Sequence, residues 1–120
     1  IDGSSAVADY RMTVDQYLYS FISFKFNVVF CLGGINFGTQ FDIQNQIAAM
    51  VKLLRNRDSR IYWRCYTQSD APNFFPWTMD LLAHFAEMFN FEIIEMAADV
   101  GETIYCEWLS NNRSITYQAT

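Results

Sequence analysis

Hydrophobic periodicity switches along this chain between the two-residue repeat of a strand and the three-to-four-residue repeat of a helix. Strand-type runs occupy residues 24–32, 60–67, 91–96, 103–109 and 114–117. Helical stripes occupy residues 7–21 and 39–54, and a third begins near Pro76. The order is therefore α-β-α-β-α-β-β-β. Strand–helix–strand units join parallel strands through right-handed crossovers. We predict an α/β domain, with α+β as the alternative, built on a mixed sheet of four to five strands with two to three helices.

The segment 24–32 is the clearest predicted strand. One of its faces is entirely apolar and comprises Phe24, Phe26, Val28, Phe30 and Leu32. The opposite face begins with Lys25 and Asn27 but becomes apolar at Val29 and Cys31. A strand that is apolar on both faces is typical of a sheet centre covered on both sides. We therefore expect this strand to be central and covered on both sides.

Two glycines, Gly33 and Gly34, end this strand, and Thr39 begins a helix with Asp42 three residues later, which is a weak form of the capping box. A glycine-rich loop between a strand and a helix can hold phosphates at the helix N-terminus. The spacing over residues 33–38 matches neither a dinucleotide fingerprint nor a P-loop. Asp42 would also repel an anion, so a tight structural turn is the favoured interpretation.

The length of 120 residues suits one domain that buries a core without metals or disulfides. Residues 1–5 are expected to be a disordered terminus or a cloning remnant, and residues 6–120 the single domain. Because the chain begins with Ile1 rather than methionine, we interpret it as part of a larger protein or a processed product. Aromatic residues make up 18% of the chain. Such a small domain has little interior for them, and apolar surface left over usually marks a partner interface.

The net charge of −5 argues against binding of nucleic acid or anionic membrane by the whole surface. No apolar run approaches the length of a membrane span. The three cysteines, Cys31, Cys65 and Cys106, form no C-x-x-C pair and lie in apolar runs. Reduced thiols suit an intracellular protein, cytoplasmic or nuclear. The sequence predicts no metal site and no cofactor.

Basic residues concentrate in one short region of the chain: Lys52, Arg55, Arg57, Arg60 and Arg64. The first three end a predicted helix, where positive charge complements the helix dipole. The last two alternate with tyrosines on one predicted strand face, which comprises Arg60, Tyr62, Arg64 and Tyr66. Such a face can pack against the chain's own acids, bind another protein through interface-favoured residues, or stack bases and pair phosphates of RNA. These three interpretations stay open at this point.

Aromatic side chains also cluster at Phe74, Phe75 and Trp77, between a loop and the third predicted helix. Three large aromatics within four residues are not expected to share one core. We therefore predict that at least one of them is exposed or buried against a partner, which makes this cluster a second candidate interface.

His84 is the one histidine of the chain, with Asp80 and Glu87 nearby on the same predicted helix face. An arrangement of this kind could perform general acid–base chemistry, alone or with a cysteine. A solvated polar face explains the same residues equally well.

The sequence resembles no family closely enough to name one. The residues favour a non-enzymatic domain that binds a protein partner or a second copy of itself through Phe74, Phe75, Trp77 and the Arg/Tyr strand face. The first alternative is an RNA-binding module that uses Lys52, Arg55, Arg57, Arg60 and Arg64. The second is a small enzyme centred on His84.

Overall fold

A four-stranded mixed sheet with the strand order β1-β2-β4-β3 organises the molecule. The computed structural model describes residues 1, 7–20, 25–32, 35–99 and 101–111. Along the chain the elements are α1 (Val14–Ser20), β1 (Val28–Leu32), α2 (Gln40–Val51), β2 (Arg60–Tyr66), α3 (Met79–Met88), β3 (Phe91–Ala98) and β4 (Thr103–Ser110). The mixed α/β class, with three helices and four strands, is confirmed. The predicted strand at 114–117 and the predicted terminus at 1–5 lie largely or wholly outside the described residues.

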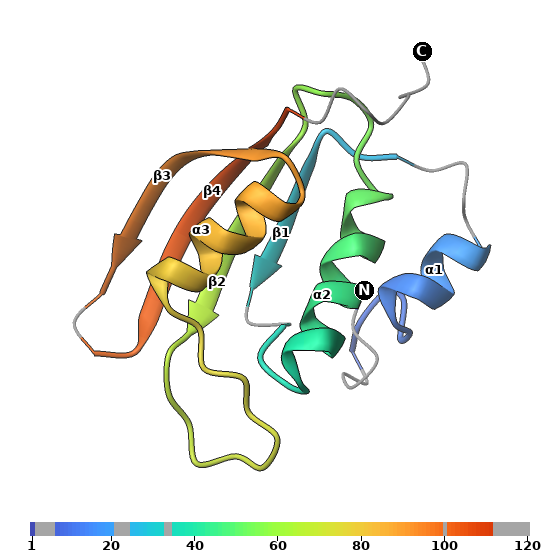
Figure 1. Cartoon of the computed structure of the whole chain (residues 1–120). Helices are drawn as coiled ribbons and strands as arrows, with labels where there is room; N and C mark the ends of the chain where they lie inside the picture. The colour runs from blue at the N-terminus through green and yellow to red at the C-terminus, as the bar shows by residue number, and fades with distance from the viewer. Residues whose placement is uncertain (2–6, 21–24, 33–34, 100, 112–120) are drawn as a thin grey trace.

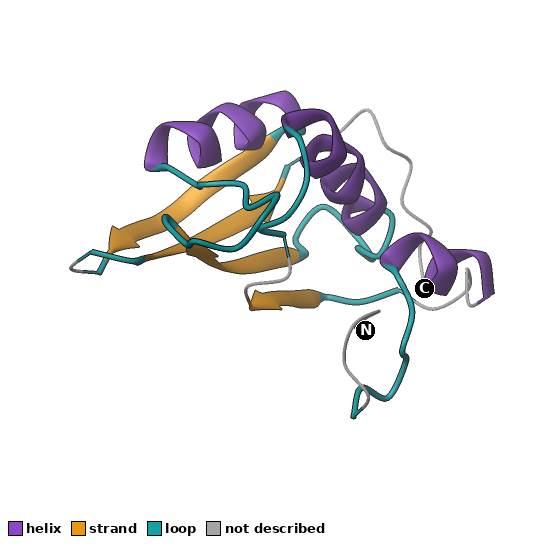
Figure 2. Cartoon of the chain, turned by 90° about the horizontal axis from the view of Figure 1, so that it is seen from below, coloured by secondary structure: helices purple, strands orange, loops and turns teal. Residues whose placement is uncertain are grey.

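Helices α2 and α3 lie on one face of the sheet, and α1 packs against α2 beyond the β1 edge (Figures 1 and 2). Strand burial alternates accordingly. In β2, Ile61, Trp63 and Cys65 are buried beneath the helices, as the sequence predicts, whereas Arg60 and Tyr66 point the other way. No described helix covers the opposite face of the sheet.

The prediction that the first strand is central is wrong, because β1 is an outer strand of the described sheet. The expectation that both of its faces are covered is also wrong. Cys31 faces the core, whereas Phe30 and Leu32 are exposed by 65% and 61%. Both faces of this segment are apolar, so its pattern alone does not show which face meets the helices. The short run that includes Val29 and Cys31 packs against α2 and decides the orientation.

The two crossover units differ in how their strands pair. β1 and β2 pair in parallel through α2, as expected. β2 and β3 also run in the same direction, but they do not pair, because β4 lies between them and is antiparallel to both. β4 is therefore an inner strand, and β3 lies at the edge of the described sheet.

Three threonines begin the three helices. The capping box at Thr39 is confirmed, since the side chains of Thr39 and Asp42 bond reciprocally to each other's backbone N–H groups. Thr13 and Gln16 form the same arrangement at α1. This cap lies well after residue 7, at which the first helix was expected to begin. Thr78 accepts a bond from the backbone N–H of Leu81, so α3 begins after the predicted Pro76.

Tryptophans form the centre of the core. The ring of Trp63 lies 4.9 Å from that of Trp108 and 6.0 Å from that of Trp77, centroid to centroid. The Trp77 ring also packs edge-on against Phe85 of α3. This cluster connects β2, β4, α3 and the loop before α3, so the sheet and its helical cover share one core.

Candidate protein-interaction surface

The sheet face opposite the helices is the surface on which most of the predicted site residues gather, and we call it the open face. From β1 to β3 it comprises Val28, Phe30, Leu32, Arg60, Tyr62, Arg64, Tyr66, Leu109, Glu107, Tyr105, Thr103, Glu92, Glu95 and Ala97. Strand register aligns these residues in rows, since paired residues point to the same side of a sheet. One row reads Phe30, Tyr62, Glu107 and Glu95 across the four strands.

Exposed aromatic and aliphatic side chains occupy the β1 side of the open face. The rings of Phe30 and Tyr62 stack with centroids 5.1 Å apart and planes inclined by 16°. Leu32 lies beside Phe30 along β1, and Tyr105 of β4 is 50% exposed. Apolar side chains that adjoin across strands make a continuous patch, and such a patch on a small domain typically marks an interaction site.

Arg60 points at the chain's own acids. Its guanidinium donates to the carboxylate of Glu107 on the neighbouring strand, and the two form an ion pair. The hydrogen bond to Glu107 and a second one to Tyr62 raise the pKa of Arg60 further above its already high usual value. The intramolecular interpretation of the Arg/Tyr face therefore holds at Arg60.

Arg64 is in a different environment. Register places it between Leu32 of β1 and Tyr105 of β4, both uncharged. Its guanidinium carbon lies 5.8 Å from the centroid of the Tyr66 ring, within the range of a cation–π contact. Its Nε is buried and has no hydrogen-bond partner among the described residues. Arg64 thus has a buried, unsatisfied Nε and lies in an aromatic setting on the open face, and arginine and tyrosine are enriched at interface hot spots.

The other basic residues of the predicted cluster lie at the end of the sheet where β1 and β2 begin. Lys52 is the C-cap of α2 and its side chain is exposed, which agrees with the helix-dipole interpretation. Arg55 and Arg57 are exposed in the turn that leads to β2. Lys25, which the sequence did not single out, joins them, because its Nζ donates to the Lys52 carbonyl at 2.5 Å.

The aromatic cluster before α3 is mainly a core feature. Phe75 and Trp77 are buried, and the Trp77 indole N–H donates to the carbonyl of Ile35 at 2.5 Å. Phe74 is half-buried and packs edge-on against Phe37. Phe75 and Trp77 therefore share the core, which leaves Phe74 as the member of the cluster that is partly exposed.

The buried side-chain amide of Asn36 fixes the loop that follows β1. Asn36 donates from Nδ2 to the carbonyls of Tyr66 and Phe75, at 3.0 and 3.2 Å. At its other end, the Asp42 carboxylate occupies the N-terminus of α2 through the capping box. This arrangement supports the structural interpretation of the glycine-rich segment, although Gly33 and Gly34 themselves lie outside the described residues.

His84 and the three cysteines lie in different environments. His84 is exposed on α3 beside Phe85 and lines neither of the two grooves described for this chain. All three cysteines are buried free thiols. Burial raises the pKa of Cys65 strongly and that of Cys106 to about 11, so both are protonated at neutral pH. In the described part of the chain, no group of His, Cys, Asp or Glu side chains could hold a metal ion.

Sequence reasoning missed the exposure of Phe30, Leu32 and Tyr105. For Tyr105 a signal was present, since Thr103, Tyr105 and Glu107 alternate with the buried Ile104 and Cys106. No comparable signal marks Phe30, because the face to which it belongs is the more hydrophobic face of its strand.

Comparison with known proteins provides no family for this chain. No protein-family model matches the sequence, and no curated protein matches it significantly. Among the described residues, no helix has the length and apolar character needed to cross a bilayer. We therefore infer function from the geometry of the open face.

Proposed function

We propose that this chain is a non-enzymatic interaction domain and that its open face binds a second copy of the same chain. The observation that carries the proposal is the exposed patch formed by Phe30, Leu32 and Tyr105 around the unsatisfied Arg64. Leaving such a patch in water is unfavourable, because burial of apolar surface contributes about 25 cal/mol per Å².

A sheet face is well suited to this kind of contact. Two sheets pack face to face at a separation of about 10 Å when their inner faces are apolar. In a symmetric dimer the same residues appear on both sides of the interface. The stacked pair of Phe30 and Tyr62 would then supply the flat aromatic centre of the contact.

The charges of the open face favour a second copy as its partner. The face carries two arginines and three glutamates, of which Arg60 and Glu107 pair within the chain. Arg64 remains on β2, while the exposed Glu92 and Glu95 lie on β3. A second copy therefore brings carboxylates to which the Arg64 guanidinium can donate, and such charge-assisted bonds are strong when shielded from water.

The test is the solution mass of the chain measured by analytical ultracentrifugation over a range of concentrations. We expect a mass above the 14.0 kDa of one chain, and we expect Phe30→Asp to shift the equilibrium to the monomer. Phe41→Asp is the matched control, because Phe41 is 69% exposed on α2, away from the open face. A wild-type monomer at every concentration, or equal effects of the two substitutions, would contradict the proposal.

RNA binding is the second candidate, and the Phe30–Tyr62 stack with Arg64 nearby is the observation that favours it. Exposed rings on an open sheet can stack unpaired bases. The glutamates of the face and the net charge of −5 act against it. An RNA binder should lose affinity for single-stranded RNA steeply with added salt, and further on Arg64→Ala. An absence of binding at low salt would exclude this function.

A further inference from the structure

The outer edge of β1 presents backbone groups that no described strand pairs. The carbonyl of Asn27 accepts a bond from the N–H of Arg60 at 2.9 Å, so this residue and every second one after it bond toward β2. The N–H and C=O groups of Val28, Phe30 and Leu32 consequently point away from the sheet. Such an edge is a template for one more strand.

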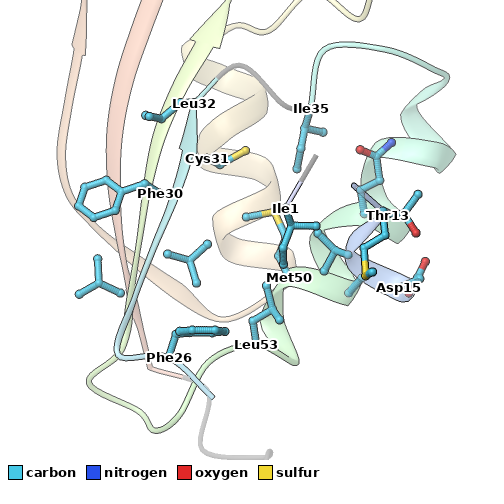
Figure 3. Close-up of a pocket in the computed structure, with 16 residues that line it drawn as sticks. Ile1, Thr13, Asp15, Phe26, Phe30, Cys31, Leu32, Ile35, Met50 and Leu53 are labelled. Carbon is cyan, nitrogen blue, oxygen red and sulfur yellow. The ribbon is translucent and has the colours of Figure 1, made fainter. Parts of the chain in front are cut away.

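A groove of about 760 Å³ runs alongside this edge (Figure 3). β1 forms one wall, and Met12, Thr13 and Val14 at the start of α1 form the other. Ala49, Met50 and Leu53 of α2 and the turn after it lie between the two walls. The strand edge and the groove are thus side by side, which is the geometry that lets a strand pair its backbone while its alternate side chains enter a pocket.

Ile1 shows which side chains the groove accepts. It lines the groove together with Met50 (Figure 3), and its side chain remains 46% exposed. Phe26, Val29 and Cys31 are among the groove's apolar lining residues, and Thr13, Asp15 and Gln46 are its polar ones. An aliphatic side chain from an extended segment therefore matches both the shape and the chemistry of this site.

Basic side chains flank one end of the groove. Phe26 is held against the turn after α2 by bonds to the backbone of Leu53 and Arg55, at 2.8 and 2.9 Å. Lys25 and Lys52 are exposed beside it, and the Lys25 ammonium donates to the backbone carbonyl of Lys52. A peptide that enters along β1 would meet these ammonium groups at this end, where a carboxylate would be favoured.

We propose that the β1 edge and its groove bind an extended peptide as an added strand, with aliphatic residues at alternate positions and an acidic residue at the end beside Lys25. The described edge is five residues long, so the bound segment spans about 17 Å. The side chains that face α1 fill the groove, and those of the other set extend the open face. This site shares β1 with the self-association proposed above, but it does not depend on that proposal.

The probe is a fluorescent synthetic peptide of about eight residues with valine at alternate positions and aspartate at both ends, measured by anisotropy with the full chain. We expect saturable binding. N-methylation of the alternate peptide amides that face β1 should weaken binding at least tenfold, because it removes the backbone donors and leaves the side chains. Replacing the aspartates with asparagine should weaken it by a smaller factor.

Phe30→Pro and Phe30→Ala form the matched pair on the protein. Proline removes an N–H that faces outward and spares the bonds to β2, so Phe30→Pro should bind at least tenfold more weakly than Phe30→Ala. If Phe30→Pro fails to fold, the N-methylated peptide still tests the proposal on the wild-type chain. Equal binding of the methylated and unmethylated peptides, or no saturation up to millimolar peptide, would overturn it. Tyr105→Asp, on the open face but away from the groove, should leave peptide binding intact even if it alters the solution mass.

Discussion

The buried amide of Asn36 is expected to be a major stabilising group, and the change that tests this is Asn36→Leu. Asn36 is 2% exposed, and its side chain joins the loop after β1 to the end of β2 and to the loop before α3. Leucine has a similar volume but offers no hydrogen bond. The carbonyls of Tyr66 and Phe75 would each lose a donor while remaining in the protein interior.

The size of the effect follows from these two bonds. A buried polar group left without its partner costs about 1–3 kcal/mol. Part of the loss at Tyr66 is relieved, because its carbonyl also accepts a weaker bond from the Trp77 backbone N–H at 3.3 Å. We therefore expect Asn36→Leu to lower the free energy of unfolding by about 2–4 kcal/mol. For a chain of 120 residues, this corresponds to a fall in Tm of roughly 8–16 °C.

Guanidinium denaturation followed by tryptophan fluorescence is the appropriate assay, since the core tryptophans report on the same region. Asn45→Leu is the control. Asn45 is exposed on α2, and its replacement should change stability by less than about 0.5 kcal/mol. If Asn36→Leu were no more destabilising than Asn45→Leu, the loop after β1 would not depend on this amide, and the structural account of that loop would be wrong.

Two further predictions concern glycine and cysteine. Gly38 and Gly101 both have positive φ, at 112° and 102°, but a Cβ at Gly38 would lie 2.8 Å from Asp42 Oδ2, whereas one at Gly101 meets nothing within 4 Å. Gly101→Ala should cost about 1–2 kcal/mol from backbone strain alone and Gly38→Ala about 1 kcal/mol more through the α2 cap, as measured by the same denaturation assay. Because burial raises the pKa of Cys106 from 9.0 to about 11, the folded state favours the protonated thiol, so this contribution to stability is complete below pH 9 and is lost as pH rises toward 11. Unfolding at pH 8 and pH 10.5 should show the decline and Cys106→Ala should reduce it, whereas equal decline in both proteins would mean that other groups cause it.

Local patterns were sufficient where one face of an element differs in polarity from the other. In β2, Ile61, Trp63 and Cys65 alternate with arginine and tyrosine, so both the strand and its orientation were predictable. The cap at Thr39 was equally clear from Thr39 and Asp42. At α1 and α3 the threonines that cap the helices lie within stretches already compatible with helix, so the boundaries were missed.

Tertiary features lay beyond local patterns. Nothing in the sequence of β4 marks it as the strand that separates β2 from β3, because position in a sheet depends on how whole strands compete for partners. Half of the candidate site could not be predicted for the same reason. The Arg/Tyr face was predicted from β2 alone, but the exposed Phe30 and Leu32 beside it could not be, since they are exposed because no described helix covers that face of the sheet.

The central place of β4 also has a kinetic consequence. β4 is the last described strand in the chain, yet it forms every strand pairing that connects the β1–β2 pair to β3. During synthesis, residues 28–98 would emerge as two separate parts, a parallel pair and a lone strand, with no ladder between them. Such non-local pairing slows folding and leaves unpaired strands exposed to other chains in the interval. The sheet of this domain can close only when residues 103–110 arrive between the two parts.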